Sequence, residues 1–267
     1  MNNLVKEVKN LLQIAKNTLK GKKLIEKTGK INVKGDVTIG MDVRIEELFL
    51  NYIKKQNLPA TIFSEEIGAV RFHEKPKLTI AFDPLDGSTN YRVGNELLPY
   101  GVLIAVYKGV KPRLKDIICA GALENTKGFM WIYDGKQTKN LINNKVIRIK
   151  NDWEIHKSTP VYFDLYYKKA FDTFSTLPEK VHVRWNGSTI SSLMYVLSNT
   201  AAGMGSVCMR AEEIGAVYGL IRGAGGIVVN ADGTDLGEEE FDPKRTYFIL
   251  GGCEKIVRFC LKEINKL

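Results

Sequence analysis

Short apolar runs typical of buried strands alternate along this chain with segments of helical periodicity. Strands are expected at residues 60–63, 77–82, 101–109, 118–123, 128–135, 159–164, 181–185, 226–230 and 246–252. Helices are expected at residues 3–20, 41–57, 188–199 and 211–226, with one more after 164 and a closing helix that runs to 267. Strands and helices that alternate with short connections are typical of layered architecture, so we expect an α/β (α+β) fold.

The 267 residues of the chain suit one large domain or two smaller ones. A polar segment at residues 139–152 interrupts the alternation of strands and helices. We therefore predict a boundary near residue 150, between an N-terminal α+β subdomain (1–150) and a C-terminal α/β subdomain (151–267).

Lysine and arginine outnumber aspartate and glutamate by 39 to 30, which gives a formal net charge of +9. An excess of this kind can mark a surface that binds nucleic acid or membrane. Here the lysines are scattered among acidic residues, which instead indicates a solvated surface of a kind common in thermophiles. We expect no nucleic-acid partner, and the basic surface favours an anionic small substrate.

Neither a zinc site nor a disulfide framework is expected, because no two of the four cysteines form a CxxC pair. The opening segment, MNNLVKEVKNLLQIAK, is amphipathic and charged throughout, unlike a signal peptide. No apolar run reaches about 18 residues, the length that a membrane span needs. These features predict a soluble cytoplasmic protein with no membrane partner.

The segment LTIAFDPLDGSTNY, residues 78–91, joins an apolar strand to a turn and a helix start. Asp83 and Asp86 are three residues apart on this turn, and two such carboxylates can converge on a hard cation. Gly87 permits a tight turn, and the helix that Ser88 opens offers bare N–H groups to a phosphate. The alternative is an Asx-type turn in which Asp86 and Ser88 only cap a helix.

Three more carboxylates precede this turn. Asp42 opens the helix at 41–57, while Glu65 and Glu66 follow the strand at 60–63. A lone pair of glutamates at a strand end is more often a solvated turn. A hydrolytic site with two or more metals needs three or four carboxylates, however, and these residues are the best candidates in the chain.

The chain resembles the inositol monophosphatase and archaeal-type fructose-1,6-bisphosphatase family, part of the lithium-sensitive, Mg²⁺-dependent sugar-phosphatase superfamily. The resemblance is carried by DVTIGMDVRIEE (36–47), FSEE (63–66), AFDPLDGSTN (81–90), GSTISSLMYVLSNTAAG (187–203) and EEIGAVYGLIRGAGG (212–226). It implies a layered αβαβα sandwich of two subdomains, with a metal site in the cleft between them, and a homodimer. The N-terminal subdomain would supply most of the metal ligands, and the C-terminal subdomain would contact the substrate.

The resemblance also implies the ligands of two or three Mg²⁺ ions. Glu65, Asp83 and the carbonyl of Leu85 would hold the first ion. Asp83, Asp86 and Glu213 would hold the second. A third, weaker ion would lie near Glu65 and approach Asp42.

The catalytic roles implied by the resemblance need no histidine or cysteine nucleophile. Metal binding lowers the pKa of water, so that hydroxide is available near neutral pH. Asp42 and Ser88 would orient this water beside Glu65. The backbone of Gly87, Ser88 and Thr89 would bind the phosphate. Glu66 and Lys34 would contact the metal ligands without binding the metal themselves.

The sequence departs from the family pattern at two substrate- and metal-binding positions. Glu212 and Glu213 stand where the family has Trp-Asp, so a longer side chain would be the ligand of the second metal. The alternative is that Glu213 is a solvated helix residue and the site is damaged. Ser206 stands where inositol phosphatases carry an acidic residue that contacts the inositol ring, which makes a different sugar phosphate more plausible.

Three arginines are candidates to contact a second phosphate of the substrate, because guanidinium groups match phosphate geometry. They are Arg92, Arg184 and Arg210, and each could equally be a surface residue.

The predicted function is therefore a Mg²⁺-dependent phosphomonoesterase acting on a phosphorylated small molecule, with inositol 1-phosphate and fructose 1,6-bisphosphate as first candidates. One alternative is a nucleotide 3′-phosphatase or NADP phosphatase of the same superfamily. Another is a catalytically weak binding or regulatory homologue, which the altered Glu212–Glu213 pair would explain.

Overall fold

The computed structural model describes residues 2–31 and 37–266. A seven-stranded sheet forms its N-terminal part, with the spatial order β4-β3-β5-β6-β7-β8-β9. Neighbouring strands in it are antiparallel except β3 and β5, which are parallel. The strands are β3 (Ala60–Ser64), β4 (Gly68–Arg71), β5 (Leu78–Asp86), β6 (Gly101–Lys108), β7 (Ile117–Glu124), β8 (Phe129–Tyr133) and β9 (Thr138–Asn140).

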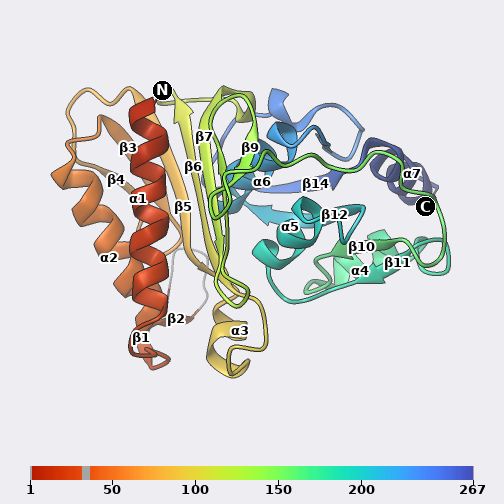
Figure 1. The fold of residues 1–267 in the computed structure, drawn as a ribbon, viewed down its shortest axis with the longest axis horizontal. Helices are drawn as coiled ribbons and strands as arrows, with labels where there is room; N and C mark the ends of the chain where they lie inside the picture. Colours follow the sequence, from red (N-terminus) through yellow and green to blue (C-terminus); the bar gives the residue numbers. More distant parts are fainter. Residues whose placement is uncertain (1, 32–36, 267) are drawn as a thin grey trace.

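Helices α1 (Asn2–Leu19) and α2 (Gly40–Lys55) cover one face of this sheet (Figure 1). The apolar side chains of α1 that recur at helical spacing, from Val8 to Leu19, are buried against it. A two-stranded pair, β1 (Lys27–Ile31) and β2 (Val37–Ile39), connects the two helices.

A five-stranded sheet forms the C-terminal part, with the order β11-β10-β12-β14-β13. Strand β10 is parallel to β11 and β12, whereas β14 is antiparallel to β12 and β13. The strands are β10 (Pro160–Phe163), β11 (His182–Arg184), β12 (Gly203–Arg210), β13 (Ile227–Val229) and β14 (Thr246–Gly252).

The two sheets are joined by a middle layer of helices, α5 (Thr189–Leu197) and α6 (Ala211–Gly223) (Figure 1). Helix α6 contacts β6 and β7 of one sheet and β14 of the other, and every residue of it except Arg222 is buried. Helices α4 (Lys168–Phe174) and α7 (Glu254–Ile264) pack on β12 and β14. The order of layers is therefore αβαβα, which confirms the predicted fold.

The shorter elements are α3 (Ser88–Val93) and two 3₁₀ turns, η1 (Leu114–Asp116) and η2 (Leu236–Glu238). All strands of the seven-stranded sheet precede residue 150 and all strands of the other follow it. Helix α6 nevertheless belongs to the second half of the chain and packs on both sheets. The division into two subdomains stays a prediction.

The short strands β1, β2, β4 and β9 are absent from the sequence expectation, and two longer strands also differ from it. Strand β12 was not predicted, because GMGSVCMR has three small residues in its first four and no regular alternation. The strand predicted at 77–82 continues to Asp86, with an irregularity in its pairing with β6 between Asp83 and Asp86. Both aspartates thus lie on the end of a strand. Among the described residues, no helix is both long and apolar enough to cross a membrane.

Candidate active site

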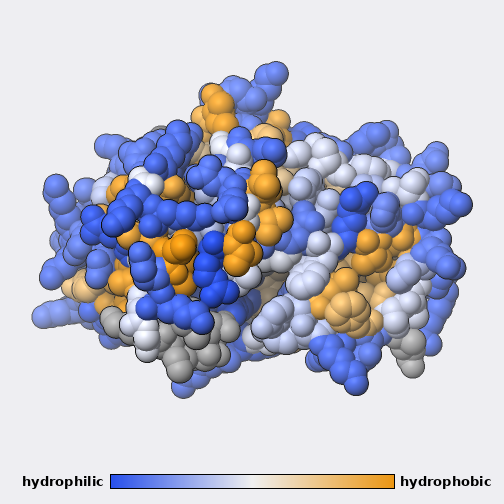
Figure 2. Space-filling view, turned by 90° about the horizontal axis from the view of Figure 1, so that it is seen from below, coloured by the Kyte–Doolittle hydropathy of each residue, from blue (hydrophilic) through white to orange (hydrophobic). Residues whose placement is uncertain are grey.

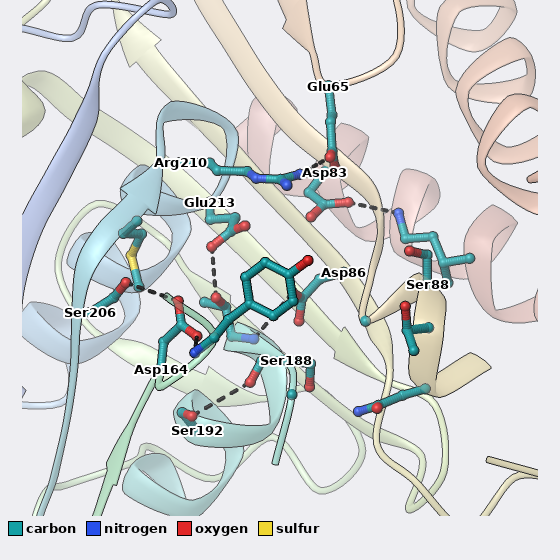
Figure 3. Close-up of a pocket in the computed structure, with 18 of the residues that line it drawn as sticks. Glu65, Asp83, Asp86, Ser88, Asp164, Ser188, Ser192, Ser206, Arg210 and Glu213 are labelled. Atoms are coloured by element: carbon teal, nitrogen blue, oxygen red, sulfur yellow. Dashed lines mark hydrogen bonds and ion pairs between the residues drawn. The ribbon is translucent and has the colours of Figure 1, made fainter. Parts of the chain in front are cut away.

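A cavity of about 550 Å³ opens where the ends of β3, β5 and β12 meet the starts of α5 and α6. Both halves of the chain line it, as Figure 3 shows for its labelled residues. The predicted residues that line it are Asp42, Glu65, Glu66, Asp83, Leu85, Asp86, Gly87, Ser88, Thr89, Arg92, Ser206, Arg210 and Glu213. Arg184 lies on the edge strand β11, exposed and outside the lining, and Lys34 lies outside the described residues.

Three buried carboxylates form the centre of this cavity. One oxygen each of Asp83, Asp86 and Glu213 lies within 4.8 Å of the others. Asp83 is 3% exposed, and its Oδ1 accepts a hydrogen bond of 2.8 Å from the N–H of Leu85. The structure thus brings together residues that are 130 positions apart in the sequence (213 − 83).

Asp86 also caps a helix, although not the one that the Asx-turn alternative would predict. Its Oδ1 accepts from the N–H of Thr189 at 3.1 Å, and its Oδ2 accepts from the N–H of Ile190 at 2.6 Å. These amides open α5, more than a hundred residues further along the chain. The positive end of the α5 dipole therefore stabilises the negative charge of Asp86.

Glu213 reaches the cluster from the first turn of α6, because β12 ends at Arg210 and the helix begins directly after it. The hydroxyl of Thr189 donates a hydrogen bond of 2.6 Å to Glu213 Oε2. Although glutamate is one methylene longer than aspartate, its carboxylate still lies beside Thr189, Asp83 and Asp86. This position counts against the alternative that Glu213 is a solvated helix residue.

The cluster is poor in positive charge. Burial, and then repulsion from Asp86 and Glu213, raises the pKa of Asp83 well above its usual range. Burial likewise raises the pKa of Glu213 to about 8 and that of Asp86 to about 6. A divalent cation would relieve this repulsion, and buried carboxylate oxygens are the ligands that such a hard cation prefers. The donor set therefore fits a divalent metal.

A second group of carboxylates lies beside the first. Asp42 Oδ2 accepts from the N–H of Ile39 at 2.9 Å, and burial raises the pKa of Asp42 to about 7, with a further contribution from Glu66 and Glu46. Glu66 accepts a hydrogen bond from the hydroxyl of Thr38. Asp42 and Glu66 therefore add further negative charge beside the first cluster.

Arg210 forms an ion pair with Glu65 (Figure 3). Glu65 follows β3 in the seven-stranded sheet and Arg210 ends β12 in the five-stranded one, so the pair crosses the cavity between the two sheets. Arg210, which was predicted to contact substrate, is therefore paired with Glu65, which was predicted to bind metal.

The turn after β5 requires glycine at position 87. Gly87 has φ +80°, and a Cβ there would lie 2.9 Å from Cβ of Ser188. This absence of a side chain lets the turn at Gly87 approach the start of α5. Ser88 and Thr89 follow at the start of the short helix α3, where both line the cavity.

Several lining residues were not predicted. Ser188 is the N-cap of α5, Thr189 and Ser192 belong to that helix, and Asp164 follows directly after β10. The rim includes the rings of Tyr166, Tyr167 and Trp185. Asp164 ends a predicted strand (159–164), and a carboxylate at a strand end was the one signal that could have indicated it.

Comparison with known proteins identifies the family to which the chain belongs. The sequence pattern of the "Inositol monophosphatase family" matches residues 2–262. A fructose-1,6-bisphosphatase/inositol-1-monophosphatase of Thermococcus kodakarensis is 27% identical over 237 residues, 88% of this chain and 85% of that protein. A protein of the same name from Methanothermobacter thermautotrophicus is 26% identical over 220 residues, 78% and 76% of the two chains.

The fold agrees with this comparison. The solved structure of an inositol monophosphatase from Anabaena superposes with a TM-score of 0.77 over 100% of this chain and 96% of the other, at 19% identity. Fold and acidic cavity together define a phosphatase of the layered sugar-phosphatase type. The chain belongs to the inositol monophosphatase family.

Proposed function

We propose that the protein is a Mg²⁺-dependent phosphomonoesterase that hydrolyses a sugar or inositol phosphate. The observation that carries this proposal is the buried cluster of Asp83, Asp86 and Glu213 inside a cavity large enough for a small ligand. The names of the archaeal relatives support inositol 1-phosphate and fructose 1,6-bisphosphate as the first substrates to test.

Each part of the cavity has a proposed role. Glu65, Asp83 and the carbonyl of Leu85 would hold one ion, and Asp83 with Asp86 and Glu213 a second. Bound Mg²⁺ would supply the charge that activates water and stabilises the leaving oxygen.

The remaining roles belong to the groups beside the cluster. Asp42 and Ser88 would orient the attacking water. The backbone of residues 87–89 would bind the phosphate, and Glu66 would support Glu65. Arg92, which lines the cavity, would meet a second anionic group.

The test is phosphate release at pH 7–8, with and without Mg²⁺, from inositol 1-phosphate, fructose 1,6-bisphosphate, 3′-phosphoadenosine 5′-phosphate and NADP. Mg²⁺-dependent release from the first two is expected. Release only from the nucleotides would move the protein to the nucleotide phosphatases of the superfamily. Absence of release from every ester at every Mg²⁺ concentration would favour the binding or regulatory homologue.

Glu213 offers a test of the second metal position. Glu213→Ala should raise the Mg²⁺ concentration needed for half-maximal activity by more than about tenfold, since outer partners of metal ligands alone cost 10–100-fold. Glu213→Asp should retain activity, because it keeps the carboxylate. Metal titration followed by activity and by calorimetry checks both variants. An unchanged Mg²⁺ requirement in Glu213→Ala would remove Glu213 from the ligand set.

A homodimer, a cytoplasmic location and a thermophilic source remain predictions. Apolar residues occur in several separate patches on the face shown in Figure 2, with hydrophilic residues between them. Light scattering after gel filtration measures the oligomeric state directly.

A further inference from the structure

Asp164 holds a carboxylate in the cavity that the proposed mechanism does not use. It follows β10, and its backbone N–H donates to the carbonyl of Gly205 at 2.9 Å, which fixes it beside β12. Figure 3 shows it beside Ser206, on the far side of Asp86 and Glu213 from Glu65. Among the described residues, the group of carboxylates close enough to share a metal ion does not include Asp164.

The hydrogen bonds of Asp164 hold its side chain in one orientation. Its Oδ1 accepts from the N–H of Tyr166 at 3.1 Å, and its Oδ2 accepts from the hydroxyl of Ser206 at 3.3 Å. Ser206 is 3% exposed, and its hydroxyl in turn accepts from the N–H of Cys208 at 3.2 Å. The serine thus directs its own proton toward Asp164.

This carboxylate keeps acceptor capacity for a ligand. Two carboxylate oxygens offer about four acceptor positions, and the bonds from Tyr166 and Ser206 use two of them. No lysine or arginine in the described part of the chain forms an ion pair with Asp164. The remaining positions are therefore available to donors in the cavity.

The chemistry of the cavity decides which donors these are. Asp164 is itself a carboxylate and would repel an anionic group, so the part of the ligand that meets Asp164 is a neutral donor. Two neighbouring hydroxyls on one ring can donate to the two oxygens of one carboxylate. Beside Asp164 the chain continues into the exposed rings of Tyr166 and Tyr167, which are 72% and 40% exposed and line the same cavity. Aromatic walls with a few fixed polar groups are typical of pockets that orient a small ligand.

We propose that Asp164 accepts hydrogen bonds from two neighbouring hydroxyls of the substrate ring and so selects phosphate esters of vicinal diols. This inference rests on the proposed phosphatase function and adds its specificity-determining residue. Ser206 is the positioning residue that holds the carboxylate.

The experiment compares Asp164→Asn with the matched control Asp172→Asn, an exposed aspartate of α4 outside the cavity lining. KM and kcat are measured for inositol 1-phosphate and for p-nitrophenyl phosphate, which has no hydroxyl to donate. In Asp164→Asn, KM for inositol 1-phosphate should rise about 10–100-fold, the range of a lost hydrogen bond to a charged group. Its kcat, the kinetics with p-nitrophenyl phosphate and the Mg²⁺ requirement should stay within about twofold.

Three results would overturn the proposal. Unchanged kinetics with inositol 1-phosphate would show that Asp164 does not contact the ring. An equal loss with both esters would make Asp164 a structural residue of the cavity. A raised Mg²⁺ requirement would make it part of the metal site.

The proposed function fails separately, when the unchanged protein releases phosphate from no ester. Binding of inositol 1-phosphate to the original protein and to Asp164→Asn, measured by calorimetry in Mg²⁺, then makes the same comparison without turnover. Equal affinities in that measurement would also overturn the role of Asp164.

Discussion

Replacement of Asp83 by asparagine should lower phosphate release by more than about a hundredfold, the upper end of the loss expected for an outer partner of a metal ligand. Asp83 is the carboxylate that would be shared by the two proposed ions, and Asp86, Glu213 and Asp42 all act electrostatically on it. Asparagine has nearly the same shape and can still accept from the N–H of Leu85 through its amide oxygen. The change therefore removes charge from the cluster and leaves the packing of β5 intact.

Calorimetric titration with Mg²⁺ and phosphate release measure the two consequences of Asp83→Asn. The matched control is Asp152→Asn, because the side chain of Asp152 is 75% exposed and Asp152 is not among the residues that line the cavity. In the absence of metal, Asp83→Asn should melt at a higher temperature than the original protein at pH 8, since it relieves repulsion between buried carboxylates. Wild-type turnover with an unchanged Mg²⁺ requirement would contradict the two-metal assignment.

Much of the site could be predicted because its residues lie in short ordered motifs. The strand that ends in Asp83 and Asp86 has a local pattern, and the resemblance supplied Glu213 from a distant motif. The hydrogen bonds from Thr189 and Ile190 to Asp86 could not be predicted, since they join parts of the chain 103 and 104 residues apart. Which helix an aspartate caps depends on tertiary packing.

Strand β12 and Asp164 show where sequence patterns carry too little information. Residues 203–210 form a central strand in spite of low strand propensity, because β10 and β14 pair with them on both sides. Asp164 is a single acidic residue with no partner at a characteristic spacing. Its position in the cavity follows from the parallel pairing of β10 with β12, which places it beside Ser206.

The metal-free protein should lose stability as the pH rises from about 5 to about 9. Burial raises the pKa values of Asp86, Asp42 and Glu213 to about 6, 7 and 8, above their values near 4 in the unfolded chain. Between about pH 4 and pH 8 the folded protein therefore binds more protons than the unfolded protein, and the free energy of unfolding falls with pH. The contribution of these three groups to the free energy of unfolding is fully present below about pH 4. It is lost as the pH rises through the raised pKa values of the folded protein.

Mg²⁺ should reverse this trend, because the ion binds the deprotonated carboxylates and its binding releases protons. Thermal melting from pH 5 to 9, with chelator and with millimolar Mg²⁺, should give midpoints that diverge as the pH rises. Glu213→Gln removes the carboxylate with the pKa of about 8, so it should flatten the chelator curve above pH 6 and shrink the gain from Mg²⁺. Glu74→Gln, at an exposed position outside the cavity lining, is the matched control. Parallel curves with and without Mg²⁺ would mean that the buried cluster does not exchange protons for metal, and the metal-activated water mechanism would lose its electrostatic basis.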